Sequence, residues 1–146
     1  MYDIIVIGAG VVGASIAREL ARYKLNIAVL EAGSDAAAGS SGANSGIVHA
    51  GYDCKPGTLM ARLNVQGNAM YDRICKELDV PFRRNGSLVL AFNDEDVFQL
   101  ERLMVQGVKN GVADLRLLPA NEVLEMEPSI NPGVVAALWA PTGGIT

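Results

Sequence analysis

The N-terminal part of the chain alternates short apolar runs with a glycine-rich break. Tyr2–Ile7 is apolar and rich in β-branched residues, a pattern typical of a strand that a parallel sheet buries on both faces. Gly8–Gly13 interrupts this run, the pattern of a helix extends from Val11 to about Tyr23, and Asn26–Leu30 repeats the strand pattern. Because parallel neighbouring strands need a crossover connection, these segments predict one βαβ unit.

The rest of the chain predicts two longer helices among short strands. In chain order we expect an extended piece at Ile47–His49, a helix opened by Pro56-Gly57-Thr58 and ending at Leu78, a turn at Arg83–Gly86, a strand at Ser87–Phe92, a helix from Asn93 or Asp94 to Lys109 stopped by Asn110-Gly111, a strand near Leu115–Leu118, a short helix at Asn121–Met126 and a strand at Val134–Trp139. Helical spacing predicts two core-facing stripes, which are Leu59, Leu63, Met70, Ile74 and Leu78 in the first long helix and Val97, Leu100, Met104 and Val108 in the second.

Composition narrows the class of protein. Half of the 146 residues are hydrophobic, 16 are glycine and the formal net charge is −4, which suits a compact α/β protein and argues against nucleic-acid binding. No apolar run is long enough to cross a bilayer, and the apolar start carries Asp3 without a basic leader, so we expect no signal peptide. Cys54 and Cys75 lack a CxxC pairing, which predicts free thiols and a cytoplasmic setting.

The strongest motif is Gly8-Ala9-Gly10-Val11-Val12-Gly13, a GxGxxG between the expected strand and helix. Gly8 permits a tight turn, Gly10 lets the backbone approach a pyrophosphate, and Gly13 allows close contact between helix and strand. Glu31 ends the second strand at the spacing expected of a carboxylate that binds ribose hydroxyls, and its charge disfavours the 2′-phosphate of NADP. The alternative is a glycine-rich turn without a ligand. The motif alone does not separate NAD from FAD.

The loop Gly33–Gly46 is rich in glycine, serine and alanine and longer than an ordinary connection. From Ser40 to Tyr52 the chain reads SSGANSGIVHAGY, followed by Lys55-Pro56-Gly57. This run resembles the FAD-dependent glycerol-3-phosphate dehydrogenases and, equally, the L-2-hydroxyglutarate dehydrogenases and oxidases, which belong to the D-amino-acid-oxidase-like superfamily. The similarity continues through GSLVLAF and WAPTGGI, so it covers nearly the whole chain. Its motifs are specific to the superfamily but discriminate poorly among substrates.

The resemblance implies FAD as the cofactor and an α/β fold, in which a Rossmann-like FAD-binding βαβ unit precedes the beginning of an inserted mixed-sheet substrate domain. On this basis residues 1–80 are expected to form the N-terminal part of the FAD-binding domain and residues 81–146 the incomplete first part of the substrate domain. The implied cofactor-binding residues are Gly8, Gly10, Gly13 and Glu31 for the ADP half, and Ser40, Ser41, Asn44 and Ser45 for phosphate or ribityl groups. For each of these loop side chains, a polar surface role without a ligand is the alternative.

His49 is the only histidine. A lone histidine beside an apolar strand is more often structural than catalytic. In the resembled family, however, a histidine in this stretch lies beside the isoalloxazine ring, where it would stabilise negative charge on the reduced flavin. The resemblance therefore implies His49 as the catalytic residue, and some relatives attach FAD covalently through a histidine in a comparable stretch. Tyr52 and Lys55 are candidates to face the flavin or an anionic substrate, whereas Arg83 and Arg84 are expected in a solvated turn.

The expected function is an FAD-dependent dehydrogenase that oxidises a small, hydroxyl-bearing anionic substrate, glycerol 3-phosphate or a 2-hydroxy acid, by hydride transfer to flavin. A quinone, a partner redox subunit or oxygen would accept the electrons, and such a partner would give peripheral membrane association. No metal site is expected. Alternatives are an NAD-linked dehydrogenase, an FAD-dependent amine or amino-acid oxidase, and a catalytically inactive truncated fragment. The resemblance also implies that a later segment completes the FAD-binding sheet, without which exposed apolar surface would favour association.

Overall fold

The computed structural model describes residues 1–146, which form two compact units, Met1–Ser45 and Gly46–Thr146. The first unit has one helix and a two-stranded sheet, and the second has three helices, a three-stranded sheet and a two-stranded sheet. The boundary expected between residues 80 and 81 falls inside the second unit, and as a statement about complete domains it stays a prediction.

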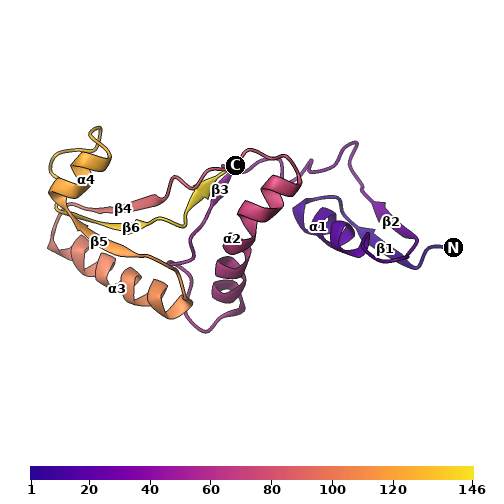
Figure 1. Cartoon of the computed structure of the whole chain (residues 1–146), viewed down its shortest axis with the longest axis horizontal. Coiled ribbons are helices and arrows are strands. Elements are labelled where there is room, and N and C mark those ends of the chain that lie inside the picture. Colours follow the sequence, from indigo (N-terminus) through magenta and orange to yellow (C-terminus); the bar gives the residue numbers. More distant parts are fainter. The chain divides into compact units, whose positions relative to one another are not determined.

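The first unit is the expected βαβ unit. Strand β1 (Ile4–Ile7) pairs in parallel with β2 (Ile27–Leu30), and helix α1 (Val11–Leu20) connects them and packs on the sheet (Figure 1). The register joins Ile4 to Ile27 and Ile7 to Leu30, so the carboxyl ends of both strands lie at the same edge. The helix ends three residues before the expected Tyr23. The alternation of apolar runs and a glycine break therefore gave the element order and the pairing correctly.

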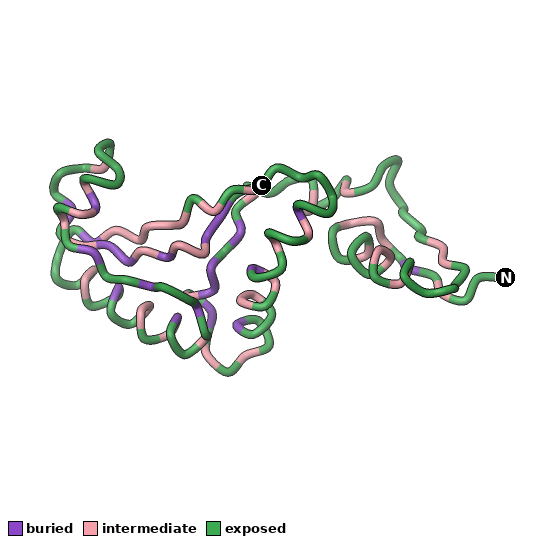
Figure 2. Tube along the Cα trace, viewed as in Figure 1, coloured by how far each residue is buried: buried purple, intermediate pink, exposed green.

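The expectation that these strands are buried on both faces was wrong. Val6 is buried, whereas Ile5, Val29 and Leu30 are exposed and Ile7 is 86% exposed. Figure 2 shows that most of the trace of this unit is exposed or intermediate. The physical reason is that a parallel strand is buried on both faces only where helices cover both, and α1 is the only helix of this unit. The unit consequently leaves one apolar sheet face uncovered within residues 1–45.

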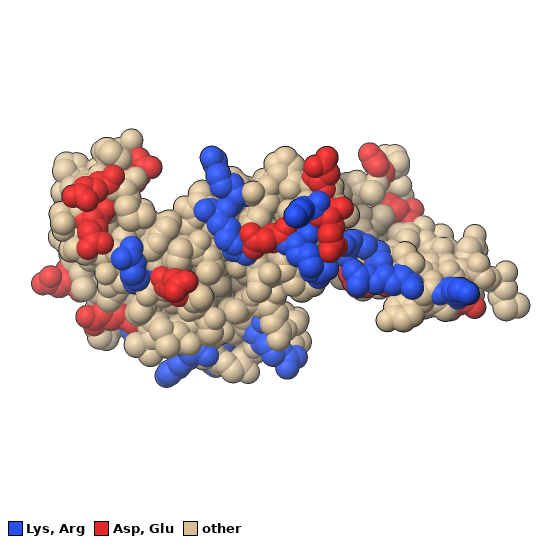
Figure 3. Space-filling view, viewed as in Figure 1, with Lys and Arg blue, Asp and Glu red and all other residues tan.

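The sheet of the second unit is antiparallel and three-stranded. Its order is β4 (Ser87–Ala91), β6 (Ala136–Ala140) and β5 (Arg116–Pro119). Helix α3 (Asp94–Asn110) packs on one face and α4 (Ala120–Met126) on the other (Figure 1). The acidic side chains over α4 are visible in Figure 3. Because side chains alternate along a strand, β4 and β6 contribute to both of the apolar clusters that result.

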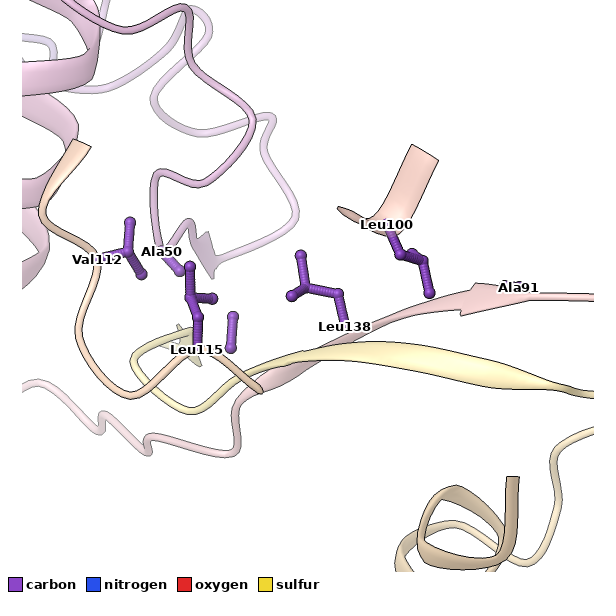
Figure 4. Packing of buried hydrophobic residues seen from close by; sticks show 7 residues of the cluster. Ala50, Ala91, Leu100, Val112, Leu115 and Leu138 are labelled. Carbon is purple, nitrogen blue, oxygen red and sulfur yellow. The ribbon is translucent and has the colours of Figure 1, made fainter. Parts of the chain in front are cut away.

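The larger cluster joins the sheet to the segment that follows β3. Leu100 of α3 and Leu138 of β6 are both fully buried. In Figure 4 the Leu100 side chain extends from the helix toward the sheet, and Leu138 rises from the sheet into the same layer. The buried members of this cluster are Ala50, Ala91, Leu100, Val112, Leu115, Leu138 and Ala140. Ala50 comes from outside the sheet, so this core also fixes the chain immediately after His49.

The remaining elements are helix α2 (Leu59–Glu77) and a short antiparallel pair, β3 (Ile47–Val48) with β7 (Gly144–Ile145). The sequence pattern did not predict β7, because a strand of two residues has no readable alternation. The helix ends behave as expected: the Thr58 hydroxyl accepts a hydrogen bond from the backbone N–H of Ala61, and Gly111 closes α3 with a φ of 82°.

The apolar stripe of α2 was assigned to the core wrongly. Leu59, Leu63, Met70 and Leu78 are exposed, and Ile74 is half-buried. The residues of α2 that are buried instead are Ala61, Asn68 and Cys75. This helix therefore packs through two small residues and through Asn68, whose side chain hydrogen bonds, and hydrophobic spacing identifies neither kind of contact. In α3 the expected stripe holds for Val97, Leu100 and Met104, whereas Val108 is exposed.

Candidate functional site

The glycine turn between β1 and α1 has the geometry its spacing predicts. Gly8 has a φ of 96°, a conformation that residues with a Cβ rarely adopt. A Cβ atom at Gly13 would collide with the carbonyl oxygen of Gly8 and lie 3.3 Å from Cγ1 of Val6. Gly13 therefore permits the close approach of helix and strand. Gly10 precedes the helix in an extended conformation, with no side chain to cap it.

Backbone N–H groups gather at this turn. The N–H of Ala9 donates to Oε2 of Glu31 over 2.7 Å, and the N–H of Val11 donates to Oγ of Ser41 over 2.8 Å. The N–H groups of Val12 and Gly13 have no acceptor within the chain. Unpaired N–H groups and the positive end of a helix dipole together attract an anion. The turn is thus suited to holding a phosphate.

Glu31 lies beside the glycine turn because β1 and β2 are parallel and end at the same edge. Gly8 N–H donates to the Leu30 carbonyl oxygen over 2.7 Å, which joins the two strand ends. The Glu31 carboxylate also accepts from Gly33 N–H over 2.9 Å. The backbone N–H groups of Gly33 and then Ala9 lower the pKa of this carboxyl group, so it is ionised at neutral pH. It remains exposed and open to a hydroxyl donor.

The serine-rich loop contributes unequally to the turn. Ser41 is half-buried and reaches Val11, and Asn44 Nδ2 donates to the Ser41 carbonyl oxygen over 2.7 Å. Ser40 and Ser45 are exposed, and their side chains make no hydrogen bond within the chain. The structure therefore brings the Ser41 side chain to the glycine turn, with Asn44 bonded to the main chain of Ser41, and leaves Ser40 and Ser45 exposed to solvent.

His49 belongs to the second unit. Its side chain is exposed and lines a cleft of about 380 Å³, and Tyr52, Asn85 and Ser87 supply further polar groups to the lining. The main chain of β3 and β7 forms part of the wall. The cleft thus combines an imidazole with hydroxyl and amide groups, all of which can hydrogen bond to a polar ligand.

Arg84 is not the solvated turn residue that the sequence suggested. Its guanidinium donates to Asp72 through Nε over 2.9 Å and to Oδ1 of Asn68 through Nη1 over 2.9 Å, and it stacks 5.2 Å from the centre of the Phe82 ring. The Arg84 hydrogen bonds hold the pKa of Asp72 below its usual value. No sequence motif predicted these hydrogen bonds between Arg84, Asp72 and Asn68. Arg83 is exposed, as expected.

Lys55 is exposed and Tyr52 is half-buried against the larger core cluster. Cys54 and Cys75 are both buried free thiols, as expected, and burial raises the pKa of each. The side chains of Lys55, Tyr52, Cys54 and Cys75 thus add no charged group to the cleft beside His49.

None of the helices is both long and apolar enough to cross a membrane.

Fold and turn together define the class: this is an α/β protein whose N-terminal βαβ unit has the geometry of a dinucleotide-binding site. The chain matches the model of the FAD dependent oxidoreductase family over residues 3–146. It belongs to that family, which confirms the resemblance drawn from the Gly/Ser loop and the fold class expected from it.

Named relatives are similar along the whole chain. It is 53% identical over 145 residues to a glycerol 3-phosphate dehydrogenase of Caloramator mitchellensis, covering 99% of this chain and 30% of that protein. It is 37% identical over 148 residues to a mitochondrial L-2-hydroxyglutarate dehydrogenase of Dictyostelium discoideum, covering 99% of this chain and 33% of that protein. The chain therefore spans about a third of the length of these relatives.

Solved structures agree with this placement. An L-α-glycerophosphate oxidase of Mycoplasma pneumoniae, solved with FAD bound, superposes with a TM-score of 0.89 at 32% identity, over 99% of this chain and 38% of that one. A glycine oxidase of Geobacillus kaustophilus superposes with a TM-score of 0.86 at 28% identity, over 99% of this chain and 40% of that one. The fold is thus shared by oxidases named for a phosphorylated alcohol and for an amino acid.

Proposed function

We propose that this chain binds the ADP half of FAD in an oxidoreductase that oxidises a small hydroxyl-bearing anion, either glycerol 3-phosphate or a 2-hydroxy acid. The observation that carries the proposal is the glycine turn, at which unpaired N–H groups and the Glu31 carboxylate lie at one edge of a parallel sheet. Membership of the FAD dependent oxidoreductase family supports FAD over NAD.

The residues of the first unit fit the ADP half. Phosphate oxygens would accept from the N–H groups of Val12 and Gly13, where the dipole of α1 adds a favourable field. The ionised Glu31 would accept a ribose hydroxyl and would repel a 2′-phosphate. Ser41, whose hydroxyl already reaches the start of α1, has the chemistry to share a phosphate oxygen.

In the second unit we assign His49 to the redox centre. When bound, FAD supplies the acceptor for a hydride from the substrate carbon. The imidazole of His49 would stabilise negative charge on the reduced isoalloxazine ring, through a hydrogen bond or a positive charge of its own. The cleft beside His49 would hold the reacting part of the substrate. The family motif in which His49 stands supports this role.

The substrate class rests on similarity to relatives named for glycerol 3-phosphate and L-2-hydroxyglutarate. The second candidate is oxidation of an amine or amino acid, which the glycine oxidase structure favours. A quinone, a redox subunit or oxygen would then take the electrons. A membrane-bound partner of this kind would make any membrane association peripheral, on the cytoplasmic side.

The first test is the intact mass of the purified chain together with its absorbance spectrum. Flavin bands that disappear on acid precipitation would support noncovalent FAD, and a flavin mass retained on the chain would point to attachment through His49. A Glu31→Ala variant should bind FAD more weakly, whereas Glu19→Ala, which removes an exposed carboxylate of the same unit, should bind normally. If FAD binds neither to this chain nor to the protein as its gene encodes it, the cofactor assignment is overturned.

Substrate choice needs a separate assay. The protein as its gene encodes it is supplied with glycerol 3-phosphate, L-2-hydroxyglutarate, glycine or another amino acid, and reduction of an artificial electron acceptor is measured. Turnover of a hydroxyl-bearing anion supports the proposal. Turnover of amino acids alone would replace it with the oxidase alternative.

A further inference from the structure

Asn68 of α2 is the one buried polar residue of the chain, with 6% of its surface exposed. Its side-chain amide donates to the carbonyl oxygen of His49 over 2.9 Å and to that of Thr142 over 2.8 Å. Its Oδ1 accepts from Nη1 of Arg84 over 2.9 Å. Both amide donors and the amide oxygen therefore have partners, which is what burial of such a group requires.

Arg84 completes the same network. Nε and Nη2 both donate to Oδ2 of Asp72, Nη1 donates to Asn68 and to the carbonyl oxygen of Thr142, and Nη2 donates to the Asn68 carbonyl oxygen. All five N–H groups of the guanidinium are used. Arg84 is consequently committed within the fold and has no donor left for a substrate anion.

The network joins three segments that are far apart in the sequence. His49 follows β3, Arg84 lies in the irregular segment before β4, and Thr142 lies in the turn before β7. The same three segments line the cleft beside His49. The backbone pairing between β3 and β7 covers only two residue pairs, Ile47 with Ile145 and Val48 with Gly144. Further backbone hydrogen bonds join Arg83 to Ile145 and Gly86 to Gly143, but none of them reaches the carbonyl oxygen of His49. That oxygen is held by the side chain of Asn68, which Arg84 in turn holds.

We propose that Asn68 and Arg84 are positioning residues for His49. They hold its carbonyl oxygen, and with it the main chain that carries the imidazole, in one arrangement relative to the cleft. Loss of the Asn68 amide would leave the His49 carbonyl oxygen without its donor, whereas the Thr142 carbonyl oxygen would keep its hydrogen bond from Arg84. The His49 segment would then relax until this oxygen reaches solvent or another donor. The catalytic consequence rests on the proposed function, in which His49 faces the flavin.

The test uses the fact that His49 is the only histidine, so the chain gives a single imidazole Cε1–H resonance in a proton NMR spectrum. Asn68→Asp keeps the shape and the acceptor for Arg84 but removes the amide donors. Arg84→Lys keeps the charge but not the five-donor fork. Arg73→Lys is the matched control, because Arg73 lies on the same helix and pairs only with the exposed Glu77.

We expect the His49 resonance to shift and broaden in Asn68→Asp and in Arg84→Lys, and to keep its wild-type position in Arg73→Lys. If one variant fails to fold, the other still decides the question. A wild-type resonance in a folded Asn68→Asp or Arg84→Lys chain would overturn the proposal.

A second readout separates this proposal from the function on which it rests. In the FAD-loaded protein the midpoint potential of the flavin should fall in Asn68→Asp, because a displaced imidazole no longer favours the reduced form. A shifted resonance with an unchanged potential would support positioning of His49 and would contradict its placement beside the flavin. An unshifted resonance overturns positioning, whatever the potential does.

Discussion

Gly107 allows α3 to pack against the segment that carries the His49 cleft, and replacing it with alanine should loosen that contact. The glycine is buried in the last turns of α3. A Cβ atom there would lie 2.8 Å from Cβ of Tyr52 and would collide with Cδ1 of Leu115. The leucine methyl can rotate away, whereas the Cβ of Tyr52 is fixed by its backbone. Alanine at this position therefore forces α3 and the Tyr52 segment apart.

The displacement sets the expected cost. Moving from 2.8 Å to the 3.4 Å at which ordinary contacts begin requires about 0.6 Å between α3 and Tyr52. Overpacking of this kind costs typically about 1–3 kcal/mol, against which the better helix propensity of alanine returns less than about 1 kcal/mol near a helix end. We expect Gly107→Ala to lower the free energy of unfolding of the second unit by about 1–2 kcal/mol.

Gly67 of α2 is the matched control. It also lies in a helix, but a Cβ atom there would meet nothing within 4 Å. Gly67→Ala should therefore raise the free energy of unfolding by about 0.5–1 kcal/mol through helix propensity alone. The two substitutions are chemically identical and differ only in what the new methyl group meets.

Urea unfolding followed by tryptophan fluorescence measures both variants, because Trp139 of β6 is the only tryptophan and reports on the sheet of the second unit. Changes of opposite sign support the argument. A Gly107→Ala chain as stable as the wild type would show that the contact with Tyr52 yields without cost, and the packing argument would then be refuted.

Three further outcomes concern the first unit and the thiols. Gly13→Ala should abolish FAD binding, because the added Cβ would collide with the carbonyl oxygen of Gly8 in the adjacent turn. In the control Gly39→Ala the added Cβ meets nothing within 4 Å, and FAD should bind normally. Calorimetric titration measures both affinities, and equal values would refute the role of the turn. The hydrogen bonds that lower the pKa of Glu31 from 4.5 contribute stability above that pH, which is lost as the pH falls through the lower folded-state pKa. Glu31→Gln should therefore flatten the dependence of unfolding on pH in this acidic range, as circular dichroism can measure; an unchanged profile would contradict this. Burial and the raised pKa of Cys54 and Cys75 should keep both thiols unreactive toward an aromatic disulfide reagent at neutral pH until the chain unfolds, and rapid labelling of the folded chain would show that they are accessible.

The elements that sequence predicted well are those whose signals are local. The glycine turn, the cap at Thr58 and the αL glycine at Gly111 each need only a few neighbouring residues to be recognised. The proximity of Glu31 to the turn was also predictable, because a parallel pair of strands brings both carboxyl ends to one edge. In each of these cases the positions of the residues along the chain were enough to predict where they lie in the fold.

Burial was predicted less well because it depends on what covers a surface. The apolar residues of β1 and β2 have the pattern of a strand buried on both faces, yet one helix covers only one of those faces in the first unit. The same reasoning applies to α2, whose leucines are exposed while Asn68 is buried. A hydrophobic period identifies the face of a helix but not the partner that the face meets.

The Asn68–Arg84 network shows why the second part of the candidate site was not visible in the sequence. An asparagine in a helix and an arginine in an irregular segment are ordinary surface residues by sequence. In the structure both hydrogen bond to the carbonyl oxygen of Thr142, and Asn68 also bonds to that of His49. Each of these hydrogen bonds joins residues that are far apart in the sequence, and no periodic pattern predicts such a pairing. The motif that contains His49 thus identifies the residue, whereas α2 and the segments of Arg84 and Thr142 hold the main chain that carries its imidazole. A variant that preserves the motif but alters Asn68 should therefore retain the glycine-turn site and change the environment of His49.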